Sequence, residues 1–164
     1  MVDVRASEKL SEIVNNPRIT AISLDWERPD LVSASYLYDG EERDVRIRVE
    51  VPNETYRCYR LEVYDRFKRG SIFFDVNPQN RDVWMGGINF WDSYNSGYGG
   101  FALYFLKHFL RESGCEGFEI GAGFYQGNKG EEARMVEASQ RIFERTFPKV
   151  RCRDGVLREV WGTV

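Results

Sequence analysis

Hydrophobic and polar residues alternate along much of the first half of the chain, which is the pattern of strands with one buried face. The clearest alternation lies in 44–51, where four apolar side chains share one face and charged ones the other: Val45, Ile47, Val49 and Val51. Similar runs cover Ile19–Trp26, Leu31–Tyr38, Tyr59–Phe67 and Ser71–Val76. Short turns such as Asp39-Gly40 separate these runs, so they predict neighbouring antiparallel strands.

The second half alternates longer apolar segments with helical patterns. A strand is expected over Val83–Trp91, a helix over Gly100–Ser113 and a strand over Gly117–Tyr125. A second amphipathic helix follows, with an apolar stripe, and a last hairpin turns at Asp154-Gly155; the stripe comprises Met135, Val136, Ser139, Ile142, Phe143 and Phe147. A short helix is also expected over 7–16, capped by Ser7.

This order predicts a single α+β or mixed α/β domain spanning residues 1–164, in which antiparallel strands lead into a strand–helix–strand–helix–strand unit. Because the two strands around the first long helix are joined by a crossover, we expect Val83–Trp91 and Gly117–Tyr125 to lie parallel. The pair Gly86-Gly87 indicates a bulge or a close backbone approach in the first of them.

Composition excludes several classes of protein. The chain has 164 residues, a formal net charge of -3 and 42% hydrophobic residues, which suits one folded domain. Its charge does not favour nucleic acid, and no run approaches the ~18 apolar residues of a membrane span. Three scattered cysteines and a single histidine fit a reduced cytoplasmic protein without a zinc site. The N-terminal residues also lack the apolar region of a signal peptide.

Two further groups of charged and aromatic residues, in the Tyr56–Arg69 segment and around His108, are candidates for function but have a simpler structural interpretation. Arginines and aromatic residues interleave over Tyr56–Arg69, as in some single-strand nucleic-acid binders, but Glu62 and other acids dilute the charge. We expect a solvated sheet face there, with Tyr59 and Phe67 pointing inward and no nucleic-acid partner. His108 shares a polar helix face with Tyr104 and Arg111, which predicts a surface histidine.

A glycine-rich turn, Tyr94-Asn95-Ser96-Gly97-Tyr98-Gly99-Gly100, joins an apolar strand to an apolar helix. Glycines let a backbone approach a phosphate, and the N-terminus of a helix offers N–H groups without intrahelical acceptors. The turn therefore predicts an anion site. The alternative is a plain strand-to-helix turn that uses glycine for geometry alone.

The stretch from Val83 to Val150 resembles the acetyl-CoA-binding core of the GNAT superfamily of N-acetyltransferases. In that family a strand leads into a loop of pattern Gln/Arg-x-x-Gly-x-Gly/Ala, and here Gly97 and Gly99 match both glycine positions. The Gly86-Gly87 bulge is similar to the family's splayed strand. The resemblance implies acetyl-CoA as cofactor, no metal, and contacts with the cofactor from Phe90, Asn95, Ser96, Gly97, Tyr98, Gly99, Gly100 and Asn128.

The resemblance also implies acetyl transfer to an amine of a small molecule or a protein, which needs a base and an acid. Candidates for the base are Asp75, Asp92 and Glu119, each near a strand end or the loop. Phe143 stands near the family's usual tyrosine, so Tyr125 is the candidate acid. A non-catalytic binding or assembly domain on a similar scaffold is the alternative, and the sequence leaves the acceptor and the oligomeric state open.

Overall fold

A computed structural model describes residues 18–90 and 97–164 of the chain. The helix expected over 7–16 lies outside the described residues, as do the candidate site residues Asp92, Asn95 and Ser96.

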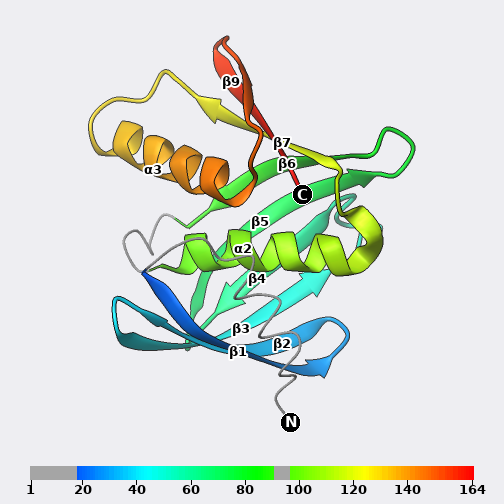
Figure 1. The fold of residues 1–164 in the computed structure, drawn as a ribbon, viewed down its shortest axis with the longest axis vertical. Helices are drawn as coiled ribbons and strands as arrows, with labels where there is room; N and C mark the ends of the chain where they lie inside the picture. The colour runs from blue at the N-terminus through cyan, green and yellow to red at the C-terminus, as the bar shows by residue number, and fades with distance from the viewer. Residues whose placement is uncertain (1–17, 91–96) are drawn as a thin grey trace.

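One nine-stranded sheet organises the molecule, with the strand order β1-β2-β3-β4-β5-β6-β7-β9-β8 (Figure 1). Neighbouring strands are antiparallel except β6 and β7, which are parallel. The strands are β1 (Ile19–Arg28), β2 (Leu31–Tyr38), β3 (Glu41–Glu50), β4 (Tyr59–Tyr64), β5 (Lys68–Asn77), β6 (Asp82–Asn89), β7 (Glu119–Tyr125), β8 (Arg151–Arg153) and β9 (Leu157–Thr163).

The alternating runs of the first half become the antiparallel part of this sheet. The turn at Asp39 and Gly40 has φ values of 51° and 81°, the left-handed geometry that a two-residue hairpin between twisted strands requires. Along β2 the predicted inward face is buried, and along β3 the buried face ends at Val49. Val51 is 65% exposed, because β3 stops at Glu50 and Pro52 follows in the loop.

Two helices cover one face of the sheet (Figure 1): α2 (Tyr98–Leu110) and α3 (Glu131–Thr146). A single wide turn, η2 (Arg111–Cys115), ends α2 where Gly114 takes a φ of 88°. β6 and β7 pair in parallel, with α2 as the crossover between them. The prediction that these two strands lie parallel is therefore confirmed. The predicted fold class, antiparallel strands followed by a strand–helix–strand–helix–strand unit, is confirmed with it.

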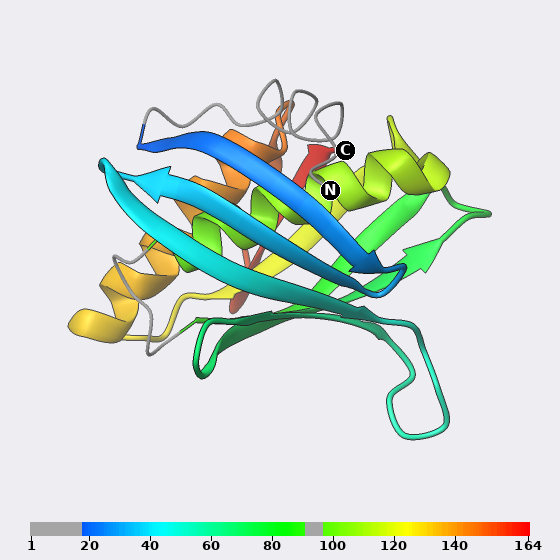
Figure 2. The same cartoon turned by 90° about the horizontal axis from the view of Figure 1, so that it is seen from below.

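The sheet curls strongly, so that β1 passes across α2 (Figure 2). Aromatic side chains from three strands surround the helix as a result: Phe101 stacks on Tyr36 of β2, Phe105 lies 5.9 Å from Trp26 of β1, and Phe109 lies 6.5 Å from Phe74 of β5. On the α3 side, the Lys107 ammonium donates a 2.7 Å hydrogen bond to the Thr146 carbonyl. The helix is therefore enclosed by the protein on most sides.

This enclosure makes the prediction of a surface histidine wrong. His108 is 3% exposed, with its ring 6.4 Å from that of Phe105, and Tyr104 on the same helix face is fully buried. The periodicity of α2 indicated one polar face, but the curled sheet and α3 cover that face too.

The prediction that Phe67 points inward is wrong as well. Phe67 is 68% exposed, since the strand β4 ends at Tyr64 and residues 65–67 form a tight turn. In that turn the Asp65 carboxylate accepts the backbone N–H of Phe67 at 2.9 Å. The alternation breaks at the irregular pairing between Val63 and Tyr64.

In the described part of the chain, no helix is long and apolar enough to cross a membrane.

Candidate functional site

The two parallel strands at the centre of the second half separate from each other. β6 and β7 pair from Asp82 opposite Glu119 to Met85 opposite Ala122, and the described pairing stops there. Beyond this point β6 continues to pair with β5, and β7 with β9. Gly86 is an extra residue on β6, because Gly87 lies opposite Phe73 and Met85 opposite Phe74. The bulge predicted at Gly86-Gly87 is therefore present, at the point of separation.

A cavity of about 550 Å³ lies where β6 and β7 separate, closed by the start of α2 and one side of α3. Six of the residues predicted to take part in the site line it: Phe90, Gly97, Gly99, Gly100, Tyr125 and Asn128. The hairpin of β1 and β2 adds a further wall through Ile19 and Tyr38, because the curled sheet brings it to α2.

The first turn of α2 presents its backbone N–H groups at this cavity. The Phe101 N–H donates to the Gly97 carbonyl at 2.9 Å, so the N–H groups of Tyr98, Gly99 and Gly100 precede the first intrahelical bond. No acidic residue stands in this turn to accept them. The positive end of the helix dipole adds to their attraction for an anion.

The glycines of this turn serve different purposes. Gly97 has a φ of 82°, and a Cβ at this position would lie 2.6 Å from the Tyr38 ring, so packing and geometry both require glycine. Among the described residues, the nearest atoms that a Cβ on Gly99 would meet belong to Phe90, the first at 3.5 Å, which is an ordinary contact. The packing of the described residues therefore does not require glycine at position 99, whereas a side chain there would narrow access to the cavity that Gly99 lines.

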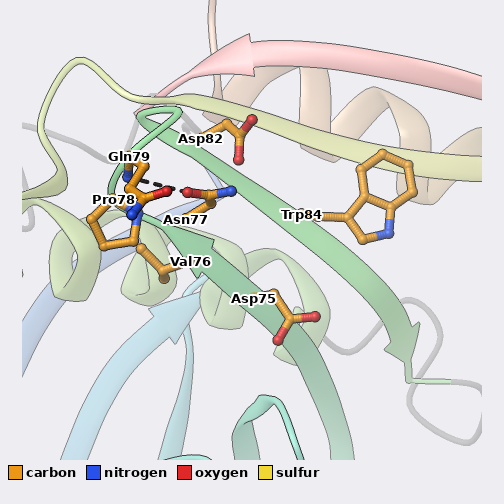
Figure 3. A pocket seen from close by; sticks show the side chains of 7 residues that line it. All are labelled: Asp75, Val76, Asn77, Pro78, Gln79, Asp82 and Trp84. Carbon is orange, nitrogen blue, oxygen red and sulfur yellow. Dashed lines mark hydrogen bonds between the residues drawn. The ribbon is translucent and has the colours of Figure 1, made fainter.

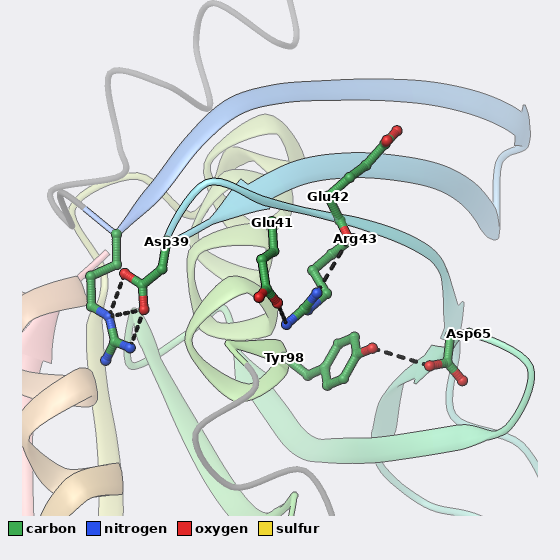
Figure 4. Close-up of polar contacts among 7 residues, drawn as sticks. Asp39, Glu41, Glu42, Arg43, Asp65 and Tyr98 are labelled. Atoms are coloured by element: carbon green, nitrogen blue, oxygen red, sulfur yellow. Dashed lines mark hydrogen bonds and ion pairs between the residues drawn. The ribbon is translucent and has the colours of Figure 1, made fainter.

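Tyr98 does not line the cavity but anchors the turn. Its hydroxyl donates a 3.1 Å hydrogen bond to Asp65, which also accepts the Arg69 guanidinium at 2.7 Å (Figure 4). Burial would raise the pKa of Asp65, but the Phe67 N–H and the hydrogen bonds from Arg69 and Tyr98 outweigh it and hold that pKa below its usual value. The start of α2 is thereby tied to the turn between β4 and β5.

The charge of the cavity differs from that of the whole chain. Arg18, Arg141 and Arg145 line it, and no Asp or Glu does among the residues that the structure describes. Arg18 is held by an ion pair with Asp39 and lies 4.5 Å over the Tyr38 ring. In a chain of net charge -3, such a cavity is suited to an anion.

The carboxylates predicted as bases lie elsewhere. Asp75 faces away from the helices, because its neighbour Phe74 points to α2, and it lines a second, open depression of about 680 Å³ with Asp82 and Trp84 (Figure 3). Glu119 stands at the paired end of β7, 57% exposed, in an ion pair with Arg151 at 3.1 Å. Neither lines the cavity between β6 and β7, so their catalytic role stays a prediction.

Of the four predicted catalytic residues, the structure brings Tyr125 to the cavity. It ends β7 on the separated side and is 51% exposed. Phe143 is fully buried in α3, 5.1 Å from Phe147 and 6.0 Å from Phe124. Its ring belongs to the core beneath the cavity.

Sequence reasoning missed the three arginines. Arg18 precedes β1, about 80 positions from the glycine turn, and only the curl of the sheet brings it there. Arg141 and Arg145 are four residues apart on α3, which places them on one helix face. That spacing, beside the apolar stripe, was the available signal.

No protein-family model matches the chain, and the search of curated proteins finds no match either. Solved structures do match. One is an acetyltransferase of the GNAT family from Bacillus anthracis, with 17% identity, 64% of each chain covered and a TM-score of 0.44. That match therefore spans less than two thirds of the other chain.

Two further structures cover nearly the whole chain. One is described as a streptothricin acetyltransferase from Bacillus anthracis str. Ames in complex with acetyl coenzyme A, with 11% identity, 96% and 92% coverage and a TM-score of 0.48. The other is nourseothricin acetyltransferase, with 11% identity, 98% and 94% coverage and a TM-score of 0.46. All three TM-scores lie below 0.5, and all three identities lie below 25%.

Proposed function

We propose that this protein is a GNAT-like N-acyltransferase that binds acetyl-CoA between β6, β7 and the start of α2 and transfers the acetyl group to an amine. One observation carries the proposal. The pairing of β6 and β7 breaks at Met85 and Ala122, directly beside a helix N-terminus without an acidic residue. Backbone groups that leave a sheet need another partner, either water or a ligand, and an extended ligand with amides and a diphosphate would supply one.

The backbone has a separate role at each end of such a ligand. The N–H groups of Gly99 and Gly100 would hold the diphosphate, and each charge-assisted hydrogen bond contributes about 1.5–3 kcal/mol. The β6 backbone from Gly86 to Ile88, which has no described partner on β7, would pair with the amides of the pantetheine arm. The strand would then orient the thioester for attack.

Acetyl-CoA supplies the acetyl group: the amine nitrogen bonds to the acetyl carbon, the carbon–sulfur bond breaks, the nitrogen loses a proton and the sulfur gains one. We assign Tyr125 the role of proton donor to the sulfur, since it is the predicted catalytic side chain that lines the cavity. Asp92 is proposed as the acceptor of the amine's proton, because the sequence places it next to the glycine turn.

A non-catalytic binding domain is the second candidate, and the burial of Phe143 favours it. Phe143 has no hydroxyl group and its ring is fully buried, so α3 offers no proton donor at that position. If Tyr125 does not supply the proton, the same cavity would bind acetyl-CoA without turning it over.

Two measurements on the purified protein separate these possibilities. Calorimetric titration with acetyl-CoA reports binding, and release of free thiol from acetyl-CoA across a panel of primary amines reports transfer. We expect both signals. Binding without thiol release from any amine supports the non-catalytic domain, and the absence of binding at millimolar acetyl-CoA contradicts the proposed function.

A further inference from the structure

We propose that Arg18, Arg141 and Arg145 form a second phosphate subsite, which binds the 3′-phosphate of coenzyme A and makes the protein discriminate acetyl-CoA from its 3′-dephospho analogue. The inference rests on the proposed function. It adds a specificity that neither the glycine turn nor the separated strands supply, because those features address the diphosphate and the pantetheine arm.

The three arginines converge on the first turn of α2 from different parts of the chain. A Cβ on Gly100 would lie 3.8 Å from Ile19 Cδ1 and 3.9 Å from Ile142 Cγ2, so β1 and α3 meet at this glycine. Arg18 precedes Ile19, and Arg141 precedes Ile142. All three arginines line the same cavity as Gly99 and Gly100.

Two of the three arginines have no carboxylate partner among the residues that the structure describes. Arg141 and Arg145 form no ion pair with any residue that the structure describes, although they are four apart on one helix and repel each other. Arg18 is different, since its bidentate contact with Asp39 and the Tyr38 ring fix the position of its guanidinium. One oriented arginine and two without a carboxylate partner make a site that a doubly charged anion would stabilise.

The chemistry of these side chains favours a phosphate. The planar guanidinium donates two parallel hydrogen bonds to a phosphate, and arginine is less strongly hydrated than lysine. The N–H groups at the start of α2 can bind the diphosphate by donating hydrogen bonds to it, without help from the arginines. Coenzyme A carries one further phosphate, on the ribose 3′ position, so a second set of cationic groups beside the first turn has a matching group in the same ligand.

The test compares two ligands and two sets of variants by calorimetric titration. Wild-type protein should bind acetyl-CoA at least about tenfold more tightly than 3′-dephospho-acetyl-CoA, which corresponds to about 1.4 kcal/mol. The double variant Arg141→Gln/Arg145→Gln should lose most of this preference, because its affinity for acetyl-CoA should fall while its affinity for the 3′-dephospho analogue stays unchanged. Arg134→Gln is the matched control, because Arg134 is an exposed arginine of α3 that does not line the cavity.

Each result has a definite meaning. Equal affinity of the wild type for both ligands overturns the subsite and leaves the proposed function standing. If the double variant loses affinity for acetyl-CoA and for its 3′-dephospho analogue to the same extent, the arginines bind the diphosphate. That result also overturns the 3′-phosphate subsite. A preserved preference together with a raised KM for acidic amine acceptors assigns the cluster to the acceptor and overturns it. If the wild type binds neither ligand, the proposed function itself is wrong.

Discussion

Both the outer face of β3–β5 and the cavity between β6, β7 and α3 carry arginines. The two regions differ in whether these arginines are paired with carboxylates. On the outer face the arginines have carboxylate partners: Arg60 contacts Glu50 and Glu62, Arg46 contacts Glu27, and Arg48 contacts Glu50. In the cavity Arg141 and Arg145 have no carboxylate partner in the described part of the chain.

The backbone shows the same contrast. β2 and β3 pair without a break from Leu31 to Tyr38, whereas β6 and β7 pair only as far as Met85. In the first region the protein satisfies its own charges and hydrogen-bonding groups, and this stabilises the fold. In the second region it leaves Arg141, Arg145 and the β6 backbone beyond Met85 available, whereas Arg18 is paired with Asp39. The comparison teaches that the binding site of this molecule lies where internal pairing stops, and the predictions below test that division.

The largest effect is expected in the paired region, on stability alone. Ile47 is fully buried in β3, opposite Val32 and Val63. Ile47→Ala should lower the free energy of unfolding by about 2–5 kcal/mol through lost burial and a cavity. Chemical denaturation measures this, and the affinity of the folded variant for acetyl-CoA should stay unchanged.

Val51→Ala is the control for this substitution, because Val51 is 65% exposed and its truncation should change stability by less than about 0.5 kcal/mol. A large loss from Val51→Ala, or a small one from Ile47→Ala, would contradict the account of the core.

The second effect concerns chemistry in the open region. Tyr125→Phe removes the proposed proton donor while keeping the ring, so the kcat of acetyl transfer should fall about 100-fold or more, with little change in the affinity for acetyl-CoA. Steady-state kinetics of thiol release measure both quantities. Tyr56→Phe, in an exposed loop position, serves as the control. An unchanged kcat would show that Tyr125 is not the acid.

The third effect separates access from packing within the glycine turn. Because the nearest described atom to a Cβ on Gly99 belongs to Phe90, at an ordinary 3.5 Å, Gly99→Val should fold, yet its branched side chain should obstruct the N–H groups. We expect acetyl-CoA affinity to fall about tenfold or more, which needs only about 1.4 kcal/mol. Circular dichroism checks the fold, and Gly155→Val in the β8–β9 turn, which does not line the cavity, is the control. Unchanged affinity in a folded Gly99→Val protein would remove this turn from the site.

The smallest effect lies where the two regions join. Tyr98→Phe removes the hydrogen bond between α2 and Asp65, and should cost about 1 kcal/mol of unfolding free energy at pH 7. The pKa of Asp65 is lower in the folded protein, so its contribution is present above the unfolded value of about 3.9 and is lost as the pH falls through the folded value. The difference between wild type and variant should therefore shrink below about pH 4. A difference independent of pH would contradict the role of the carboxylate.

The local patterns of the sequence predicted the parts of the fold that depend on neighbours in the chain. Alternation over Leu31–Tyr38 gave a strand with the expected buried face, and Gly86-Gly87 gave the bulge, because side-chain period and glycine geometry are local properties. The parallel arrangement of β6 and β7 followed from the crossover helix between them. The glycine turn itself marked the wall of the cavity.

The curl of the sheet could not be predicted in this way. It accumulates from the twist of many strand pairs, and no single segment encodes it. For that reason the burial of His108 and the arrival of Arg18 at the cavity were missed. The face of the sheet on which Asp75 lies, and the end of β7 at which Glu119 lies, likewise depend on register with the neighbouring strands.

The central claim, that the separated strands and the glycine turn are one acetyl-CoA site, is tested most directly by the amide signals of glycine. In protein labelled with ¹⁵N-glycine, titration with acetyl-CoA should shift the signals of Gly86, Gly99 and Gly123, which line the cavity, and leave those of Gly114 and Gly155 in place. Gly114 and Gly155 lie at the end of η2 and in the β8–β9 turn, outside the cavity. Unchanged spectra at millimolar acetyl-CoA, or shifts confined to Gly114 and Gly155, would contradict it.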